Sequence, residues 1–172
     1  MCLTYALNVQ LEEDVIVYKF LVKHDGTICS PYYKQGWVEG YEYTPIGDMD
    51  IEPCQNMLGE TVPDYYHVHG GAFHAYESLQ KTVNESIAFA FNYDVENEIV
   101  IGKFIIPKYS TVYRNQSTKN GYQYATDRIK FVGLVSDEEI GEMYFDRPGS
   151  VWSGMKFKDI IEAKKNESKG TD

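Results

Sequence analysis

Three of the chain's four histidines lie beside a pair of glycines, in the segment His67-Val68-His69-Gly70-Gly71-Ala72-Phe73-His74. Side chains alternate between the faces of a β-strand, so His67 and His69 are predicted to share a face. Three imidazoles suit zinc or another borderline transition metal, with a water in the fourth position. No Cys or carboxylate has a spacing that would complete the set. We therefore predict no metal and no cofactor, and His67, His69 and His74 are the candidate ligands should a metal bind.

The same segment allows two interpretations without a metal. One histidine could hydrogen-bond a ribose or phosphate, or all three could be ordinary polar residues at a turn, with His74 packed under the following helix. Gly70 and Gly71 permit either close approach of the backbone to a ligand or a positive φ at a turn. The chain has neither a Walker-type phosphate loop nor a dinucleotide fingerprint. Nucleotide binding by those two routes is not predicted.

Motifs for covalent or acid–base catalysis are also lacking. There is no Gly-x-Ser-x-Gly elbow, no His-Glu-x-x-His and no convincing glycosidase pair. Removal of Met1 would make Cys2 an N-terminal nucleophile of the amidohydrolase type, although a small apolar anchor for the first segment is the simpler interpretation. An enzyme and a binding protein both stay open.

Sequence patterns around these residues predict the helices and strands that position them. Together they indicate an α+β fold, with a mixed, mainly antiparallel twisted sheet, one main packed helix and a short C-terminal helix. Residues 14–22 followed by Asp25-Gly26 predict a hairpin. The nearly continuous apolar run over 98–106 is typical of a central strand. Ser78 is a favoured N-cap, and a helical stripe follows it: Leu79, Val83, Ile87, Ala90 and Phe91.

The 172 residues predict a single domain over 1–165 and a frayed polar tail over 166–172. A short helix is predicted over 155–165. Residues 45–64 are rich in Gly and Pro, which indicates a long surface loop of the kind that often carries function. The sequence does not indicate a function for this loop or for residues 136–172.

The charge and composition of the chain disfavour some classes of binding partner. A net charge of −10 and 26 acidic residues disfavour direct binding of nucleic acid. No apolar run is long enough to cross a bilayer and no signal sequence is evident, so no membrane partner and a cytoplasmic location are predicted. The 15 tyrosines suit core edges, flat ligands and protein interfaces, including self-association into a homo-oligomer.

Five short segments resemble small uncharacterised proteins of bacteriophages and gut-bacterial mobile elements, over roughly residues 1–135. They are Val17-Tyr18-Lys19, Ser30-Pro31-Tyr32, Gly71-Ala72-Phe73-His74-Ala75-Tyr76, Ile105-Ile106-Pro107-Lys108 and Tyr124-Ala125-Thr126-Asp127-Arg128-Ile129. The resemblance implies a setting of conflict between phage and host, and it carries no established activity.

The chain is also similar, more weakly, to the ADP-ribosyltransferase-like fold. Gly71-Ala72-Phe73, the helix with Ala88, and Ile106-Pro107-Lys108-Tyr109-Ser110 would match its first parts. The catalytic glutamate of that fold is missing, and Asp127 is the acid nearest its place. The similarity implies a nucleotide-sized cleft in which aromatic rings stack a base and Arg128 meets a phosphate. Its lining would be Tyr18, His69, His74, Tyr76, Tyr122, Tyr124 and Arg128.

These observations favour a non-catalytic binding protein of phage or mobile-element type, which recognises a host protein or a small nucleotide through a surface rich in Tyr and His. The alternative is an enzyme acting on a nucleotide, with an ADP-ribosyltransferase-like core or a His-bound metal.

Overall fold

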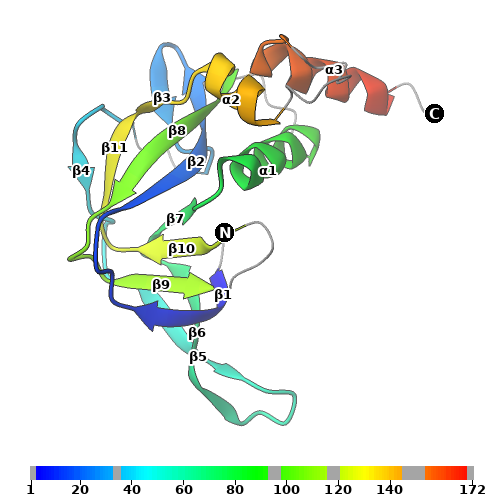
Figure 1. The fold of residues 1–172 in the computed structure, drawn as a ribbon. Coiled ribbons are helices and arrows are strands. Elements are labelled where there is room, and N and C mark those ends of the chain that lie inside the picture. The colour runs from blue at the N-terminus through cyan, green and yellow to red at the C-terminus, as the bar shows by residue number, and fades with distance from the viewer. Residues whose placement is uncertain (1–2, 33–35, 93–97, 116–120, 145–153, 170–172) are drawn as a thin grey trace.

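The structure is a computed structural model, and it describes residues 3–32, 36–92, 98–115, 121–144 and 154–169. Within them the chain forms one large sheet and three helices (Figure 1). The strands are β1 (Leu3–Val9), β2 (Val15–His24), β3 (Thr27–Cys29), β4 (Glu42–Tyr43), β5 (Asp50–Gln55), β6 (Thr61–Gly70), β7 (Phe73–Tyr76), β8 (Glu98–Ile106), β9 (Val112–Asn115), β10 (Gln123–Thr126) and β11 (Ile129–Leu134). The helices are α1 (Leu79–Asn92), α2 (Asp137–Tyr144) and α3 (Phe157–Lys169).

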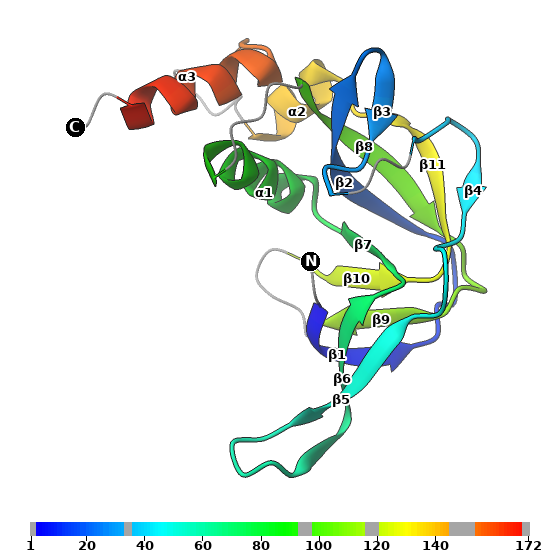
Figure 2. The same ribbon diagram turned by 180° about the vertical axis from the view of Figure 1, so that it is seen from behind.

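The sheet is antiparallel at each described pairing between strands, as the sequence predicts for most of it. Its strand order is β4-β11-β8-β2-β7-β10-β9-β1-β6-β5, with β3 added to β2. One aligned pair, Tyr18 with Tyr76, joins β2 to β7. The sheet therefore has two halves, and Figures 1 and 2 show β2, β8 and β11 running across the direction of β9 and β10.

The predicted hairpin at β2 and β3 is confirmed. Asp25 and Gly26 both have positive φ, 47° and 76°, as a two-residue type I′ turn requires. β2 then pairs with β8 along its length, from Val15 opposite Ile106 to Lys23 opposite Glu98.

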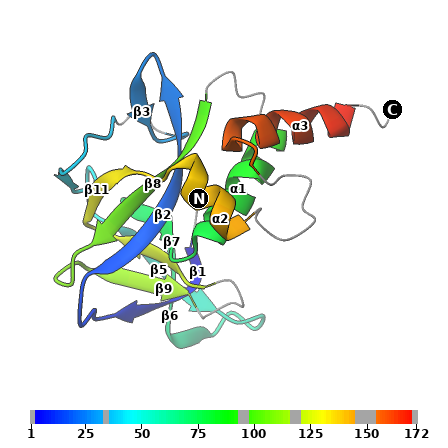
Figure 3. The same cartoon turned by 45° about the horizontal axis from the view of Figure 1, so that its top comes forward.

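The three helices cover one face of the β2–β8 half (Figure 3). Ser78 caps α1 as predicted, because its hydroxyl accepts a hydrogen bond from the Lys81 amide at 3.2 Å. The predicted stripe of α1 is buried except for Phe91, which is 43% exposed. Phe91 lies at the edge of the stripe, in the last turn. None of the helices in the described ranges is long and apolar enough to cross a membrane.

A second core lies on the opposite face of β2, where the curved sheet folds around aromatic side chains from both halves. Trp37 is 5% exposed and its ring centroid lies 5.0 Å from that of Phe104 and 5.7 Å from that of Phe73. Trp37 reaches this core from the segment after β3, and thereby ties that segment to the sheet.

One predicted loop is wrong. Residues 45–64 are not one loop, because β5 and β6 form a hairpin there; most of its side chains beyond Pro53 are exposed, so no alternating apolar pattern marks it. The C-terminal helix, predicted over 155–165, spans Phe157–Lys169. α2 also lacks an apolar signal, and it begins with three acids that favour a helix N-terminus, Asp137, Glu138 and Glu139.

Candidate functional site

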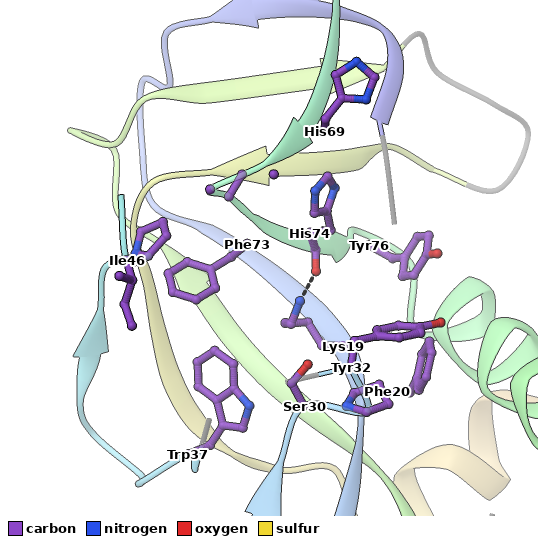
Figure 4. Close-up of a pocket in the computed structure, with 15 residues that line it drawn as sticks. Lys19, Phe20, Ser30, Tyr32, Trp37, Ile46, His69, Phe73, His74 and Tyr76 are labelled. Carbon is purple, nitrogen blue, oxygen red and sulfur yellow. Dashed lines mark hydrogen bonds between the residues drawn. The ribbon is translucent and has the colours of Figure 1, made fainter. Parts of the chain in front are cut away.

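A cavity of about 640 Å³ opens between β2, β7, the corner after β6 and the segments that follow β3 and β4 (Figure 4). Such a volume is typical of sites for small molecules. The described residues that line it are Lys19, Phe20, Ser30, Pro31, Tyr32, Trp37, Pro45, Ile46, His69, Gly70, Gly71, Ala72, Phe73, His74 and Tyr76.

The cavity exists because β2 and β7 separate beyond the Tyr18–Tyr76 pair. β7 remains paired with β10 along its other edge, where Ala75 is opposite Tyr124. The carbonyl of His74 is instead turned toward β2, and the ammonium of Lys19 donates a hydrogen bond to it. A side chain thus fills the place of a backbone donor at the point where the sheet divides.

The positive charge of Lys19 has no acidic counterion among the described residues. Burial lowers the pKa of its ammonium to about 8. No ion pair to Lys19 is found within the described part of the chain, and no Asp or Glu is among the described residues lining the cavity. A half-buried charge without a counterion is unfavourable, and an anion placed beside it would relieve that cost.

Aromatic side chains flank Lys19 on two sides. Phe20, Tyr32 and Tyr76 lie toward α1, with the ring centroids of Phe20 and Tyr32 6.5 Å apart. Trp37 and Phe73 lie on the other side, near Ile46 (Figure 4). Burial raises the pKa of the Tyr76 phenol, so this hydroxyl stays neutral. The arrangement offers apolar, flat surfaces on both sides of one positive charge.

Buried polar atoms at this site lack a partner. Trp37 Nε1 and both ring nitrogens of His74 have no hydrogen-bond partner among the described residues. Burial, followed by the nearby charge of Lys19, lowers the pKa of His74 to about 3. The ring is therefore neutral at physiological pH, with one donor and one acceptor nitrogen. Figure 4 shows it pointing away from Lys19 toward His69.

The backbone at the Gly70-Gly71 corner explains why position 71 requires glycine. Gly71 has a φ of +62°, and a Cβ there would lie 2.0 Å from the backbone oxygen of Asp48. The close approach that glycine permits is therefore to the segment before β5. This contact fixes the end of β6 and the start of β7, which carry His69 and Phe73 into the cavity wall.

The structure brings together three of the seven ligand-binding residues predicted from the sequence: His69, His74 and Tyr76 line the cavity. Tyr18 is not in the lining; its side chain packs against the hydrophobic cluster under the helices. His69 sits at the rim, where its Nε2 lies 3.4 Å from a Glu52 oxygen.

The other three predicted residues lie elsewhere. The Arg114 guanidinium lies 4.0 Å above the ring of Tyr122, and Tyr124 is 2% exposed within the core. Arg128 forms an ion pair at 3.2 Å with Glu42. Asp127, the acid nearest the place of a catalytic glutamate, accepts a hydrogen bond from the Thr111 amide at 2.8 Å.

The histidine segment forms no metal centre in the described part of the chain, where no group of three His, Cys, Asp or Glu side chains could hold an ion. His67 and His69 do share a face as predicted, with ring centroids 6.0 Å apart. Cys29 and Cys54 are free thiols. Cys2, the other nucleophile considered from the sequence, lies outside the described residues.

Sequence reasoning missed the central residue, Lys19, and the wall residues Phe20, Trp37 and Phe73. A signal for Lys19 was available, since it is a lone charge within the apolar run of β2. Three of the five short segments singled out in the sequence also contribute to the cavity, through Lys19, residues 30–32, residues 71–74 and Tyr76. The chain matches no protein-family model, no curated protein and no solved structure.

Proposed function

We propose that the chain binds a small anionic ligand with a flat ring, such as a nucleotide, in the cavity around Lys19, and holds it without converting it. The observation that carries the proposal is the half-buried ammonium of Lys19, which has no carboxylate partner among the described residues and lies between two aromatic walls. An anionic group would pair with Lys19, and a ring would lie against the aromatic side chains.

The polar atoms around Lys19 support a ligand rich in acceptors. Lys19 and Trp37 can only donate hydrogen bonds, and His74 offers one donor and one acceptor. Phosphate and carbonyl oxygens are acceptors, so a nucleotide would accept from the remaining protons of the Lys19 ammonium, which already donates to the His74 carbonyl.

The lining also supports binding over catalysis. A general base works best with a pKa near the operating pH, and the pKa of His74, about 3, is far below neutrality. Lys19 has a pKa of about 8, so at neutral pH its amine is protonated, and it is engaged with the His74 carbonyl. The described lining residues include no carboxylate. In the phage or mobile-element setting that the resemblance implies, such a protein would withdraw a nucleotide from its host.

A thermal-shift experiment with paired ligands tests the proposal. The purified chain is heated with nucleoside monophosphates, diphosphates and triphosphates, and with the matching nucleosides. A ligand at a hundred times its Kd should stabilise the fold by about 2.7 kcal/mol. We expect nucleotides to stabilise the wild-type chain more than nucleosides do, and Lys19→Met to remove that difference.

Lys130→Met is the matched control, because Lys130 is exposed and does not line the cavity. Equal shifts with nucleotides and nucleosides, or an unchanged response of Lys19→Met, would rule out the proposed site. The mass of each ligand after incubation separates the two classes of function: an unaltered mass supports a binding protein, and an altered mass supports the enzyme alternative.

A further inference from the structure

The β5–β6 hairpin extends away from the rest of the molecule, as Figures 1 and 2 show. At its tip Met57 is 105% exposed and Leu58 is 83% exposed. All of residues 55–61 are exposed, so the tip adds nothing to the buried core. Full burial of a Met or Leu side chain is worth about 1.5–3 kcal/mol, and this free energy is left available to an interface.

Asn56 holds the tip in one conformation. Its side-chain oxygen accepts hydrogen bonds from the amides of Leu58 at 2.9 Å and Glu60 at 3.0 Å. Its backbone amide donates to the Glu60 carbonyl at 2.9 Å, and its carbonyl accepts from Gly59 at 3.0 Å. A turn that is already ordered loses little entropy on binding, so the two apolar side chains are presented ready for contact.

The edge of the hairpin is not suited to strand addition. β5 is the last strand of the sheet, and Pro53 within it has no amide hydrogen to donate to a further strand. A partner is therefore expected to engage the side chains of the tip.

The charge along the hairpin, from its base at Asp50 to Glu60 at the tip, defines the class of partner. Residues 50–64 contain the acids Asp50, Glu52, Glu60 and Asp64 and no Lys or Arg. The surface of anionic lipids would repel such a hairpin. A second copy of the chain is disfavoured as well, since each copy carries a net charge of −10.

We propose that Met57 and Leu58 insert into an apolar pocket of a partner protein, and that Lys and Arg side chains around that pocket pair with the acids of the hairpin. Buried apolar anchors at the centre and charges at the rim are the usual division of an interface. This surface is separate from the cavity around Lys19 and does not depend on its ligand.

Site-specific photocrosslinking in the cells that naturally express the chain tests this. The full chain carries Met57→benzoylphenylalanine, and the control carries Tyr41→benzoylphenylalanine. Tyr41 is 65% exposed beside β4, at the opposite end of the sheet. We expect position 57, and not position 41, to give one protein adduct whose crosslinked peptide lies in an apolar pocket with Lys or Arg at its rim.

The identified partner is then purified for binding measurements. The double variant Met57→Ser/Leu58→Ser should weaken binding by roughly tenfold or more, and Glu60→Gln should reduce its dependence on salt. The double variant should keep the melting temperature of the wild type, since neither side chain is buried. Adducts to lipid, to another copy of the chain, at scattered sites or not at all, or unchanged binding by the double variant, would overturn the proposal.

Discussion

The ammonium of Lys19 donates a hydrogen bond to the backbone carbonyl of His74, across the gap where β2 and β7 part. One residue thereby completes the edge of β7 and places a positive charge at the centre of an aromatic-lined cavity. The bond satisfies the carbonyl but leaves the charge without a counterion among the described residues. Stability and binding should therefore respond to Lys19 in opposite directions.

Lys19→Met should stabilise the ligand-free chain at pH 7. The ordinary lysine pKa of 10.5 falls to about 8 in the fold, so below pH 8 the folded state bears the full cost of the buried charge. Partial exposure of the side chain and loss of the bond to His74 reduce the gain, which we expect to be about 1–2 kcal/mol. The gain should shrink as pH rises from 8 to 10.5, because the wild-type amine loses its proton in the fold first. Urea denaturation of both proteins from pH 7 to 10.5 measures this, and a variant less stable than the wild type at pH 7 would contradict it.

His74 should make the fold sensitive to acid. Its pKa falls from 6.5 to about 3, so between these values the unfolded chain binds a proton that the folded chain does not. Stability is lost as pH drops through this window, by about 2–3 kcal/mol between pH 7 and 4. His74→Gln should show a smaller loss over the same range in urea titrations. His24→Gln, at a side chain that is 65% exposed, controls for removal of a histidine; an equal acid response in all three proteins would count against a buried neutral His74.

The two glycines of the corner should differ sharply in their tolerance of alanine. Gly71→Ala combines a φ of +62° with a Cβ 2.0 Å from the Asp48 oxygen, so we expect a loss of about 3 kcal/mol in the free energy of unfolding. Gly70→Ala meets no atom within 4 Å and should change stability by less than about 1 kcal/mol. Chemical denaturation of the pair measures both, and similar losses would contradict the contact with Asp48.

Trp37 should report occupation of the cavity. The chain has two tryptophans, so Trp152→Phe leaves Trp37 as the single tryptophan, which is excited at wavelengths where the tyrosines do not absorb. Trp37 is buried in the cavity wall and its indole nitrogen has no partner among the described residues. A nucleotide near Lys19 should change its emission with a saturable dependence on concentration. The same titration on Lys19→Met should need far more ligand, whereas an identical curve would place the ligand elsewhere.

Local signals in the sequence predict much of the core of the fold. The Asp25-Gly26 turn specifies the β2–β3 hairpin because both residues tolerate positive φ, and the spacing from Leu79 to Ala90 specifies α1. β1 is not apparent because its pattern is broken at Tyr5, a bulged residue with a φ of 52°. The β5–β6 hairpin is hidden for a related reason: Asn56 organises it through polar contacts, which leave no periodic apolar trace.

The site is less predictable because it depends on contacts between distant segments. His69, His74 and Tyr76 are found because they flank a visible Gly-Gly corner. Trp37 reaches the cavity through packing on Phe73 and Phe104, which no short pattern encodes. Lys19 stands out as a charge within the apolar run of β2, and alternation places it on the face of Val17 and Leu21, both fully buried. That signal marks the residue but does not show that it lines a cavity.

The single aligned pair between Tyr18 and Tyr76 has a mechanical consequence for what the cavity can accept. A continuous ladder of backbone hydrogen bonds would hold two strands at a fixed spacing of about 4.8 Å. Beyond one pair, the distance between β2 and β7 is set by flexible side chains, with Lys19 as the longest of them. We therefore expect the spacing between β2 and β7 to adjust to a bound ligand. The thickness of the ligand, more than its outline, should set how far the two halves of the sheet lie apart.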